Sequence, residues 1–477
     1  MTQLPESFLN SLKGIEGFNK EAFEKVHASG KQVTSIRINP LKWNGEWAMD
    51  TGFPTHDSRL PSVPARAGMI HDLENIPWTD YGFYLDQRPS FTFDPLFHAG
   101  CYYVQEASGM FLEQAFKQLV DLSQPLKVLD LCAAPGGKST HIHSLISPGS
   151  LLVSNEVIRS RNNILMNNII KWGCNNVMVT QNDPSTFAKL ENYFDVIVVD
   201  APCSGSGLFR RNADAIEEWS LNNVQLCCQR QQRILADVLP ALKKDGMLIY
   251  STCAYSREED EDILNWMIEE FKPAGGVESV RIKIEESWGI VESHAGGNYS
   301  YRFFPDKVKG EGFFITCFRK RGEDKSVTSK NFLKQQSLSK IEIALVKPWI
   351  KKVDLHFIKQ NNTVFAVDEK QIPGIYILLS RLRVSYFGII LGELMREKLV
   401  PDHALAMSLI ASDKIERIEL NYDQTIQYLK RKDINIEIKS RGWVLVTYQQ
   451  QSLGWINVLQ NRVNNYYPKM LRILKDT

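Results

Sequence analysis

The residues best suited to chemistry in this chain are two cysteines that each follow an apolar, β-branched run. Cys203 closes the segment Asp200-Ala201-Pro202-Cys203, directly after one such run, and Cys253 follows the run from Met247 to Ser251. Open α/β sheets bind ligands at the carboxyl ends of their strands, so thiols at that edge can meet a substrate. The remaining cysteines are expected to be small buried hydrophobes. We therefore take Cys253, Cys203 and Asp200 as the candidate catalytic residues.

A glycine-rich loop follows an earlier apolar run, Val128 to Leu131, and leads into a helix. Glycines let the backbone approach a ligand closely, and the helix N-terminus supplies unpaired N–H donors. A triphosphate and a nucleoside cofactor are the two ligand classes that use such a loop. The triphosphate interpretation, a P-loop NTPase, fails because Cys132 stands where a P-loop requires glycine and because Pro135 stiffens the loop. The loop consists of Cys132, Ala133, Ala134, Pro135, Gly136, Gly137 and Lys138.

Acidic residues after the next two apolar runs favour the nucleoside cofactor. Glu156 lies 20 residues beyond Gly136, which is the ~20-residue spacing expected of an acid that binds ribose hydroxyls. Asp183 follows the third run, where a carboxylate can accept a hydrogen bond from an adenine amino group. This set suits S-adenosylmethionine, whose sulfonium and amine also favour the nearby Asp130. The sequence therefore predicts an S-adenosylmethionine site and no metal site.

The elements that must position these residues alternate short apolar runs with longer helical stretches from Leu126 onward. This alternation is typical of a doubly wound α/β domain with a parallel sheet. At 477 residues the chain exceeds the ~250 to 300 residues of a single core. A helical pattern over 20–27, a strand-like run over 34–39 and frequent prolines between 51 and 100 indicate a mixed α+β region before it. The predicted domains are 1–115, 116–321, 331–405 and 406–477.

Two local features have a structural explanation that requires no chemistry. Ser256 and Glu259 have the spacing of a capping box, which predicts a helix start there. The acidic run from Glu258 to Asp262 then lies in a solvated first turn, where the helix dipole favours negative charge. The polar segment from Gly322 to Lys330 is the expected linker to the C-terminal region.

Charge is segregated along the chain. Lys and Arg number 56 against 55 Asp and Glu overall, yet residues 319–359 carry 11 against 4 and residues 421–477 carry 9 against 4. Aromatic residues are interleaved with these cations, namely Trp349, Trp455, Tyr466 and Tyr467. A basic, aromatic C-terminal region is suited to RNA phosphates, which contribute affinity without sequence information. Truncation from about Lys325 is expected to weaken RNA binding and to leave cofactor binding intact.

Other classes of protein are disfavoured by what the sequence lacks. No stretch of about 18 apolar residues is present, and the N-terminus has no basic patch followed by an apolar run. The 8 cysteines form no C-x-x-C pair, which argues against a disulfide framework or a zinc site. We expect a cytoplasmic monomer with no membrane association.

These motifs resemble the Nop/Sun family of S-adenosylmethionine-dependent RNA cytosine-C5 methyltransferases, and most closely its bacterial branch that acts on small-subunit ribosomal RNA. The resemblance covers roughly residues 30 to 320, and the segment around Trp455 and Tyr466 is similar to a PUA-type RNA-binding module. It implies a Rossmann-like class I methyltransferase core with an N-terminal α+β domain and a C-terminal β-rich PUA-like domain. The matching segments are 132–138, Glu156, 182–183, 200–205, 251–253, 34–39, 103–108 and 310–314.

The resemblance also implies roles. Cys253 is the nucleophile that adds to carbon 6 of cytosine, Asp200 contacts the N3 edge of the base, and Cys203 assists release of the product. Residues 132–138 with Glu156, Asp183 and Asp200 bind the cofactor, and the implied substrate is 16S ribosomal RNA within the small subunit. Four alternatives stay open. The two thiols could exchange roles, as in DNA cytosine methyltransferases, and Lys138 could position the base, the cofactor or only the loop. The substrate could be tRNA or another RNA, or the chain could be a non-catalytic RNA-binding protein.

Overall fold

The computed structural model describes residues 4–43, 48–49, 68–69, 73–272, 275–322, 336–351, 354–437 and 440–475. Within these residues the centre is a ten-stranded sheet in the order β12-β13-β14-β10-β9-β6-β7-β8-β18, with β11 paired beside β14. Strands β10, β9, β6, β7 and β8 are parallel, and the remaining pairs are antiparallel. The sequence predicts strands over 127–131, 151–154, 177–180, 195–200, 247–251 and 313–318, and all six belong to this sheet, which confirms them. The strands are β6 (Lys127–Asp130), β7 (Leu151–Asn155), β8 (Val177–Thr180), β9 (Phe194–Asp200), β10 (Leu242–Thr252), β11 (Val277–Ser279), β12 (Val291–Ser293), β13 (Ser300–Phe303), β14 (Phe313–Lys320) and β18 (Val384–Phe387).

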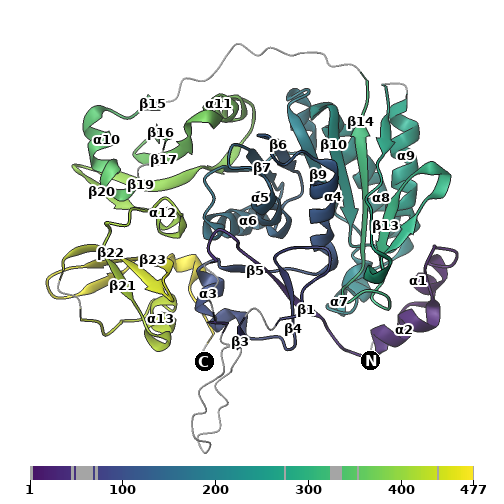
Figure 1. The fold of residues 1–477 in the computed structure, drawn as a ribbon, viewed down its shortest axis with the longest axis horizontal. Coiled ribbons are helices and arrows are strands. Elements are labelled where there is room, and N and C mark those ends of the chain that lie inside the picture. The colour runs from purple at the N-terminus through teal and green to yellow at the C-terminus, as the bar shows by residue number, and fades with distance from the viewer. Residues whose placement is uncertain are drawn as a thin grey trace, which may run out of the picture.

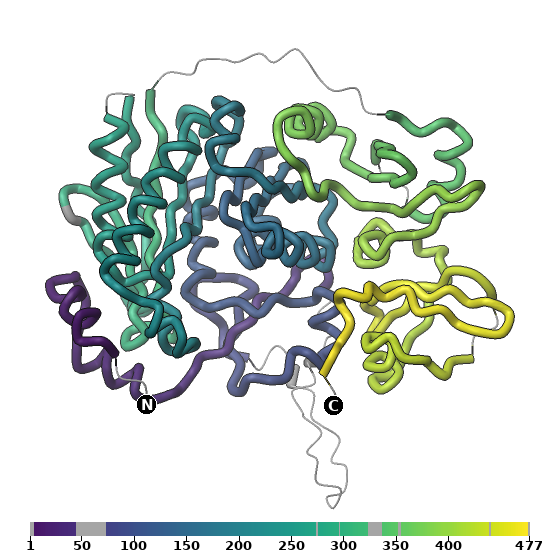
Figure 2. Tube along the Cα trace, turned by 180° about the vertical axis from the view of Figure 1, so that it is seen from behind, coloured from purple at the N-terminus to yellow at the C-terminus, as the bar shows by residue number. Residues whose placement is uncertain are grey.

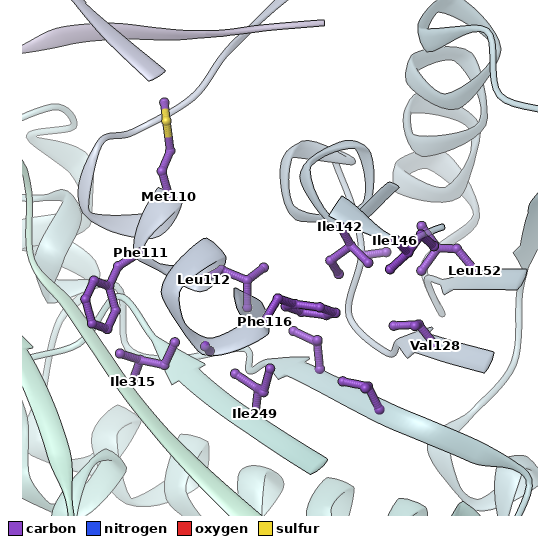
Figure 3. Close-up of a cluster of buried hydrophobic side chains, with 14 of the residues drawn as sticks. Met110, Phe111, Leu112, Phe116, Val128, Ile142, Ile146, Leu152, Ile249 and Ile315 are labelled. Carbon is purple, nitrogen blue, oxygen red and sulfur yellow. The ribbon is translucent and has the colours of Figure 1, made fainter. Parts of the chain in front are cut away.

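Helices cover both faces of the sheet (Figure 1). On one face Val128 of β6 belongs to the same core as Phe116 and Ile142 (Figure 3), whereas its neighbour Leu129 packs with Leu235 on the other. Burial on both faces explains why these strands are continuously apolar rather than alternating. Each fully buried side chain of this kind stabilises the fold by ~1.5 to 3 kcal/mol. One face carries α4 (Leu112–Leu119), α5 (Gly137–Leu145) and α6 (Arg159–Trp172), and the other carries α8 (Leu221–Val238), α9 (Glu261–Phe271) and α11 (Ile372–Arg381).

The residues before this core form a small sheet, β4-β1-β5, and two helices that lie apart from it beside α7 and β13 (Figure 1). Phe8 of α1 packs its ring 5.2 Å from that of Trp219, against the main domain. The expected helix and strand are confirmed as α2 and β1, and the residues from 73 to 100 contain no long helix, as their prolines predict. Pro54, Pro61 and Pro64 lie outside the described residues. The elements before the core are α1 (Glu6–Ser11), α2 (Lys20–Ala28), β1 (Thr34–Ile38), β2 (Ala48–Met49), β3 (Gly68–Met69), β4 (Gly82–Leu85), α3 (Pro95–His98) and β5 (Tyr102–Val104). The neighbouring helix α7 (Asp214–Glu218) belongs to the main domain.

The C-terminal residues form a five-stranded sheet, β15-β16-β17-β19-β20, and a four-stranded sheet, β21-β22-β23-β24. The β-like runs that the sequence predicts over 363–367 and 443–448 are confirmed as β17 and β22. Of the expected linker, all but Gly322 lies outside the described residues. The elements are β15 (Gln336–Ser337), α10 (Lys340–Val346), β16 (Leu355–Gln360), β17 (Thr363–Asp368), β19 (Ile389–Met395), β20 (Lys398–Pro401), α12 (His403–Met407), β21 (Arg417–Glu419), α13 (Tyr422–Leu429), β22 (Gly442–Tyr448), β23 (Gln451–Val458) and β24 (Val463–Asn465).

One C-terminal strand leaves this region and completes the main sheet. β18 pairs antiparallel with β8, with Val384 opposite Thr180 and Phe387 opposite Met178. The preceding helix α11 buries Leu378 against the face that also carries α8 and α9, and both views show this green segment beside the teal core (Figure 2). This pairing argues against the expectation that truncation from about Lys325 leaves cofactor binding intact, because that truncation removes a strand of the main sheet.

A search of the described residues finds no helix that combines the length and apolar character needed to cross a membrane.

Candidate active site

The glycine loop between β6 and α5 is shaped to fit close neighbours. Gly136 has a φ of +114°, in the left-handed region that favours glycine. A Cβ atom on Gly137 would lie 3.2 Å from the ring of Tyr103, which is tighter than ordinary contact. The side-chain amide of Asn168 donates a hydrogen bond to the carbonyl of Pro135 at 2.8 Å. The loop is a fixed cradle whose backbone, rather than its side chains, faces the edge of the sheet.

Further contacts hold the start of the same loop. The backbone N–H of Ala133 donates to the carbonyl of Asn155 at 2.8 Å, and Nη2 of Arg161 donates to the carbonyl of Ala134 at 2.8 Å. Cys132 packs against the core face that contains Leu129, and burial raises the pKa of its thiol. Cys132 therefore contributes packing, and its neighbours contribute backbone groups to the cradle.

Asp130 at the end of β6 is a buried acid with one unused oxygen. Its Oδ2 accepts a hydrogen bond from the hydroxyl of Ser139 at 2.6 Å. Its Oδ1 is buried and has no hydrogen-bond partner among the residues that the structure describes. Burial raises the pKa of Asp130 to about 7, and the nearby Asp200 carboxylate acts in the same direction. A cationic ligand group would satisfy both the free oxygen and the charge, so this site fits a ligand with a sulfonium or an amine.

Glu156 and Asp183 lie where the sequence predicts them, directly after β7 and just past β8. Oε1 of Glu156 accepts a hydrogen bond from the N–H of Ile158 at 2.9 Å, which leaves its Oε2 only a distant contact of 3.5 Å with Arg161. Asp183 caps the following turn, and hydrogen bonds from Ser185 lower its pKa. Glu156 is buried, and Oδ2 of Asp183 lies 3.7 Å from Nη2 of Arg233. Among the described residues, no group of three or more His, Cys, Asp or Glu side chains could hold a metal ion.

The two candidate thiols are brought together. Cys203 follows β9 and Cys253 follows β10, and their Sγ atoms lie 3.0 Å apart. The hydrogen bond with the Cys253 thiol and burial raise the pKa of Cys203 well above its usual value. Two sulfurs that are 50 positions apart in the chain therefore lie side by side at the edge of the sheet. Cys203 is held as a neutral thiol.

Lys138 and Asp200 form an ion pair beside these thiols. Nζ of Lys138 lies 2.7 Å from Oδ2 of Asp200, and the hydroxyl of Ser251 donates to Oδ1 of Asp200 at 2.8 Å. Burial opposes the charge on Lys138, but the attraction of Asp200, and to a smaller extent of Asp130 and Cys253, raises its pKa above the usual value. Lys138 is therefore a cation that is paired with Asp200 at this edge of the sheet.

Glu259 is a functional residue that sequence reasoning missed. Its carboxylate accepts hydrogen bonds from the N–H and the hydroxyl of Ser204, at 2.8 and 2.5 Å, and so fixes the residue next to Cys203. A backbone contact joins the two thiol loops, since the N–H of Gly207 donates to the carbonyl of Cys253 at 2.6 Å. A Cβ on Gly207 would lie 2.3 Å from that carbonyl oxygen, so only glycine permits this approach. The thiol pair is thus positioned by contacts outside both cysteines.

The capping-box interpretation of Glu259 is wrong. Ser256 makes no side-chain cap hydrogen bond, and a short 3-10 turn precedes α9. Glu259 and Asp260 are fully buried rather than solvated. Asp260 lies 3.0 Å from Nη1 of the buried Arg302. Glu259 and Asp260 are buried because they bind Ser204 and Arg302, which the spacing of Ser256 and Glu259 alone does not reveal, whereas Asp262 at the end of the run is exposed as expected.

Arg37 on β1 anchors the cofactor side of the site from outside the main domain. Its Nη2 donates to Oγ1 of Thr140 at 2.6 Å and to the carbonyl of Gly137 at 3.3 Å. The guanidinium also lies over the ring of Trp172 at 4.6 Å. The feature that could have identified Arg37 is its place as the single Arg in the strand Thr34–Ile38, which is fully buried. A buried cation requires partners.

A second anchor reaches the cofactor side from the C-terminal region. The side chain of Asn182 exchanges two hydrogen bonds with the backbone of Arg383, at 2.9 and 3.0 Å. Asn182 directly precedes Asp183, and Arg383 directly precedes β18. No sequence signal identifies Arg383, since it contributes only backbone atoms.

Comparison with protein families gives four matches in chain order. Residues 118–319 match a family described as 16S rRNA methyltransferase RsmB/F. Residues 4–107 match the N-terminal domain of 16S rRNA methyltransferase RsmF, residues 348–409 match its first C-terminal domain, and residues 416–473 match the RsmF PUA domain. These matches include the glycine loop, both thiols and the basic C-terminal region.

Curated relatives and solved structures agree with these matches. The chain is 30% identical to ribosomal RNA small subunit methyltransferase F of Vibrio cholerae over 98% of this chain and 97% of the relative. It is 28% identical to the protein of that name from Shewanella sediminis, over 99% and 97%. The fold is similar to that of NSun6 from Pyrococcus horikoshii with SFG, at a TM-score of 0.51 and 20% identity over 68% of this chain and 100% of the other. The protein thus has a Rossmann-like methyltransferase core with an N-terminal domain and a C-terminal PUA domain, and it belongs to the 16S rRNA methyltransferase RsmB/F family.

Proposed function

We propose that this protein transfers a methyl group from S-adenosylmethionine to carbon 5 of a cytidine in 16S ribosomal RNA, through a covalent bond between Cys253 and carbon 6 of the base. The observation that carries this proposal is the thiol pair, with Sγ atoms 3.0 Å apart, beside the ion pair of Lys138 and Asp200. Family membership and the names of the relatives support a methyltransferase that acts on small-subunit ribosomal RNA. A P-loop NTPase is inconsistent with that family.

The proposed cofactor residues are the loop 132–138 with Glu156, Asp183 and Asp200. S-adenosylmethionine supplies a methyl group on a positively charged sulfur. The unpartnered Oδ1 of Asp130 and the glycine cradle fit such a cation. Glu156 has the position that suits ribose hydroxyls, and Asp183 suits an adenine amino group. The backbone N–H groups at the start of α5 add hydrogen-bond donors for the carboxylate end.

The thiol chemistry follows from the weak nucleophilicity of carbon 5 while the cytosine ring is aromatic. Addition of the Cys253 thiolate to carbon 6 breaks that aromaticity, with a proton delivered at N3, and makes carbon 5 an enamine carbon. Carbon 5 then takes the methyl group. Removal of the proton from carbon 5 expels the Cys253 sulfur as a thiolate, and return of the proton from N3 restores the neutral aromatic ring. Asp200 is the proposed contact with N3, and Lys138 holds the Asp200 carboxylate in place.

The assignment of roles to the two thiols rests on the surroundings of Cys203 and on the family resemblance. Cys203 is held as a neutral thiol by Cys253 and by burial, which suits a proton donor or acceptor during release. The resemblance of residues 251–253 to the Nop/Sun family assigns the attacking sulfur to Cys253. The opposite assignment, with attack by Cys203, is the alternative that the experiment below tests.

The RNA substrate would be held by regions on both sides of the core. A target base must leave its stack at a cost of a few kcal/mol, least in loops. We propose that 1–115 and the C-terminal domains 331–405 and 406–477 bind phosphates and set the register, while 116–321 performs the chemistry, on 16S ribosomal RNA within the small subunit in the cytoplasm. We propose that the protein acts as a monomer.

The test is covalent trapping with RNA that contains 5-fluorocytidine. Fluorine cannot leave as a cation when the proton on carbon 5 would normally be removed, so the enzyme stays attached to the RNA. We expect a band shift on a denaturing gel that requires S-adenosylmethionine, with the crosslinked peptide containing Cys253. A crosslink that maps to Cys203 would reverse the roles, and the absence of any adduct from wild-type enzyme that methylates cytidine would exclude the covalent mechanism.

A further inference from the structure

A hollow of about 650 Å³ lies far from the thiols, where the two C-terminal sheets meet. Its residues come from the turn after α10, from the segment before β21 and from the start of β22, elements that lie on the opposite side of the molecule from β9 and β10 (Figure 1). This volume is within the ~300 to 1,000 Å³ of small-ligand sites. The lining residues are Lys347, Pro348, Trp349, Lys414, Ile415, Glu416 and Trp443.

The two indole rings in this hollow are held rigidly from behind. The ring of Trp349 lies edge-on to the buried Trp455, with centroids 5.8 Å apart, and that of Trp443 lies edge-on to Tyr466 at 4.4 Å. Trp349 and Trp443 are both half-buried and pack against the same core cluster. A ring fixed in this way keeps its orientation without a ligand, so little conformational entropy is lost when a ligand stacks on it.

The charge of the hollow favours an anionic ligand. Lys347 and Lys414 are exposed, and neither forms an ion pair with another residue in the described part of the chain. By contrast, the nearby cations Lys351 and Arg417 share Asp413. Glu416 is the acidic member of the lining. Two unpaired ammonium groups beside two fixed aromatic rings match a group that has both a phosphate and a flat ring.

We propose that this hollow binds a nucleotide of single-stranded RNA, with the base stacked on Trp349 or Trp443 and the flanking phosphates near Lys347 and Lys414. The inference rests on the proposed function, since it makes the hollow a second RNA contact that acts together with the active site. Base stacking on an aromatic side chain contributes without reading the sequence, and the cations track the backbone. A contact between the C-terminal sheets would hold an unpaired stretch of the substrate away from the target cytidine.

The test compares full-length variants in binding to a short, fluorescently labelled single-stranded RNA without cofactor. We expect Trp349→Ala and Trp443→Ala each to weaken binding by about 5- to 100-fold, whereas Trp349→Phe, which keeps a stacking ring, stays within about threefold of wild type. The paired change Lys347→Gln and Lys414→Gln, which leaves the packed rings intact, should lower the log-log salt slope by ~0.7 for each phosphate that the variant no longer neutralises. Matched controls are Trp266→Ala, a half-buried indole on α9, and Lys398→Gln, an exposed cation on β20.

The outcomes separate this proposal from that for the active site. Unchanged RNA affinity in both Trp→Ala variants and an unchanged salt slope in the double Lys variant would overturn the stacking site, even if methylation is normal. The Trp→Ala variants should also be measured with the same RNA made of abasic residues. If they lose as much affinity for that RNA as for the normal RNA, the stacking site is overturned, because an abasic RNA has no base to stack. Weaker binding only to assembled small subunits would indicate a protein partner instead. Methyl transfer that is absent in wild type, with RNA binding that still depends on Trp349, would contradict the active-site proposal alone.

Discussion

The two halves of the carboxyl edge of the main sheet are held in place by different parts of the chain. The loops that carry Cys203 and Cys253 are fixed by Glu259 and by the Gly207 contact, all within residues 118–319. The loops that face the proposed cofactor are fixed by Arg37 on β1 and by the backbone of Arg383 before β18. The hydrogen bonds that fix Ser204 and Cys253 come from the core, and Phe8 and Phe23 of the N-terminal helices pack behind the same loops against Phe209 and Tyr255. The cofactor half receives hydrogen bonds from both flanking regions in addition to those from the core.

This difference separates two ways in which the enzyme can fail. Changes on the thiol side should stop bond formation and leave cofactor binding intact. Changes at the anchors of the other side should weaken cofactor binding and stability together, even though Arg37 and Arg383 are far from the thiols in sequence. Substitutions on the thiol side and on the cofactor side can therefore be compared for their effects on methyl transfer, cofactor binding and stability.

The largest effect is expected from Cys253→Ala. Without the attacking sulfur no adduct can form, so methyl transfer should fall to background while S-adenosylmethionine still binds, as measured by radiolabel incorporation and calorimetry. The paired variant Cys203→Ala should methylate and then remain attached to RNA through Cys253, visible as a shifted band on a denaturing gel. An adduct formed by Cys253→Ala would contradict the assigned roles.

Truncation after Gly322 should have the next largest effect. It removes α11 and β18, and with them the buried side chains of Ile375, Leu378, Leu382 and Phe387, so the part of the core that they cover becomes exposed. At ~1.5 to 3 kcal/mol for each side chain, this loss rivals the ~5 to 15 kcal/mol of a typical domain. Thermal unfolding should show a lost or much lower transition, and calorimetry no cofactor binding. A cooperatively folded truncated protein with wild-type cofactor affinity would show that the core is independent of β18.

Glu156→Ala should weaken S-adenosylmethionine binding by ~1.5 to 3 kcal/mol, about 10- to 150-fold, because it removes a charge-assisted acceptor. Asp195→Ala is a suitable control, since Asp195 is a half-exposed acid at the other end of the sheet that pairs with Lys243. Calorimetric titration with the cofactor measures both. Equal affinities in Glu156→Ala and wild type would remove Glu156 from the site.

Asn182→Ala should cost ~1 to 3 kcal/mol of stability, because it leaves the backbone N–H of Arg383 without its partner, while the N–H of Gln181 still donates to the Arg383 carbonyl. The cofactor affinity should fall less than in Glu156→Ala, since Asp183 is displaced rather than removed. Gln181→Ala, one residue away, serves as the control. If Asn182→Ala lowers stability but leaves cofactor affinity unchanged, the C-terminal anchor is purely structural.

The smallest effect is a pH dependence of cofactor binding. Asp130 has its pKa raised to about 7 by burial, so it is protonated below that pH and must lose a proton to pair with a cationic ligand. Affinity should therefore fall as the pH drops below about 7, by at most about tenfold per pH unit, and should level off above it. Titration calorimetry across this range tests the effect, and Asp130→Asn should be weaker and flat. A flat profile in the wild type would mean that Asp130 does not face the cation.

The strands, and the position of the candidate site residues at the carboxyl edge of the sheet, were predictable from the sequence because they depend on local pattern. Strands buried on both faces must be continuously apolar, which identified β6 to β10, and the ends of parallel strands meet at one edge, which brought Cys203, Cys253, Glu156 and Asp183 into one site. Glycine in a loop that needs a positive φ marked the cradle at Gly136. Each of these inferences uses only neighbours in the chain and the geometry of a parallel sheet.

The tertiary structure alone decided how that site is held. Glu259 has the spacing of a cap, yet it binds Ser204, 55 positions earlier, and Arg383 acts through a backbone that has no sequence signature. β18 joins β8 across about 200 residues because the exposed edge of a sheet accepts any strand that can align with it. Hydrogen bonds between distant segments follow from the packing of the whole chain, so residue types and spacing determined which groups are present, and only the fold determined which of them meet.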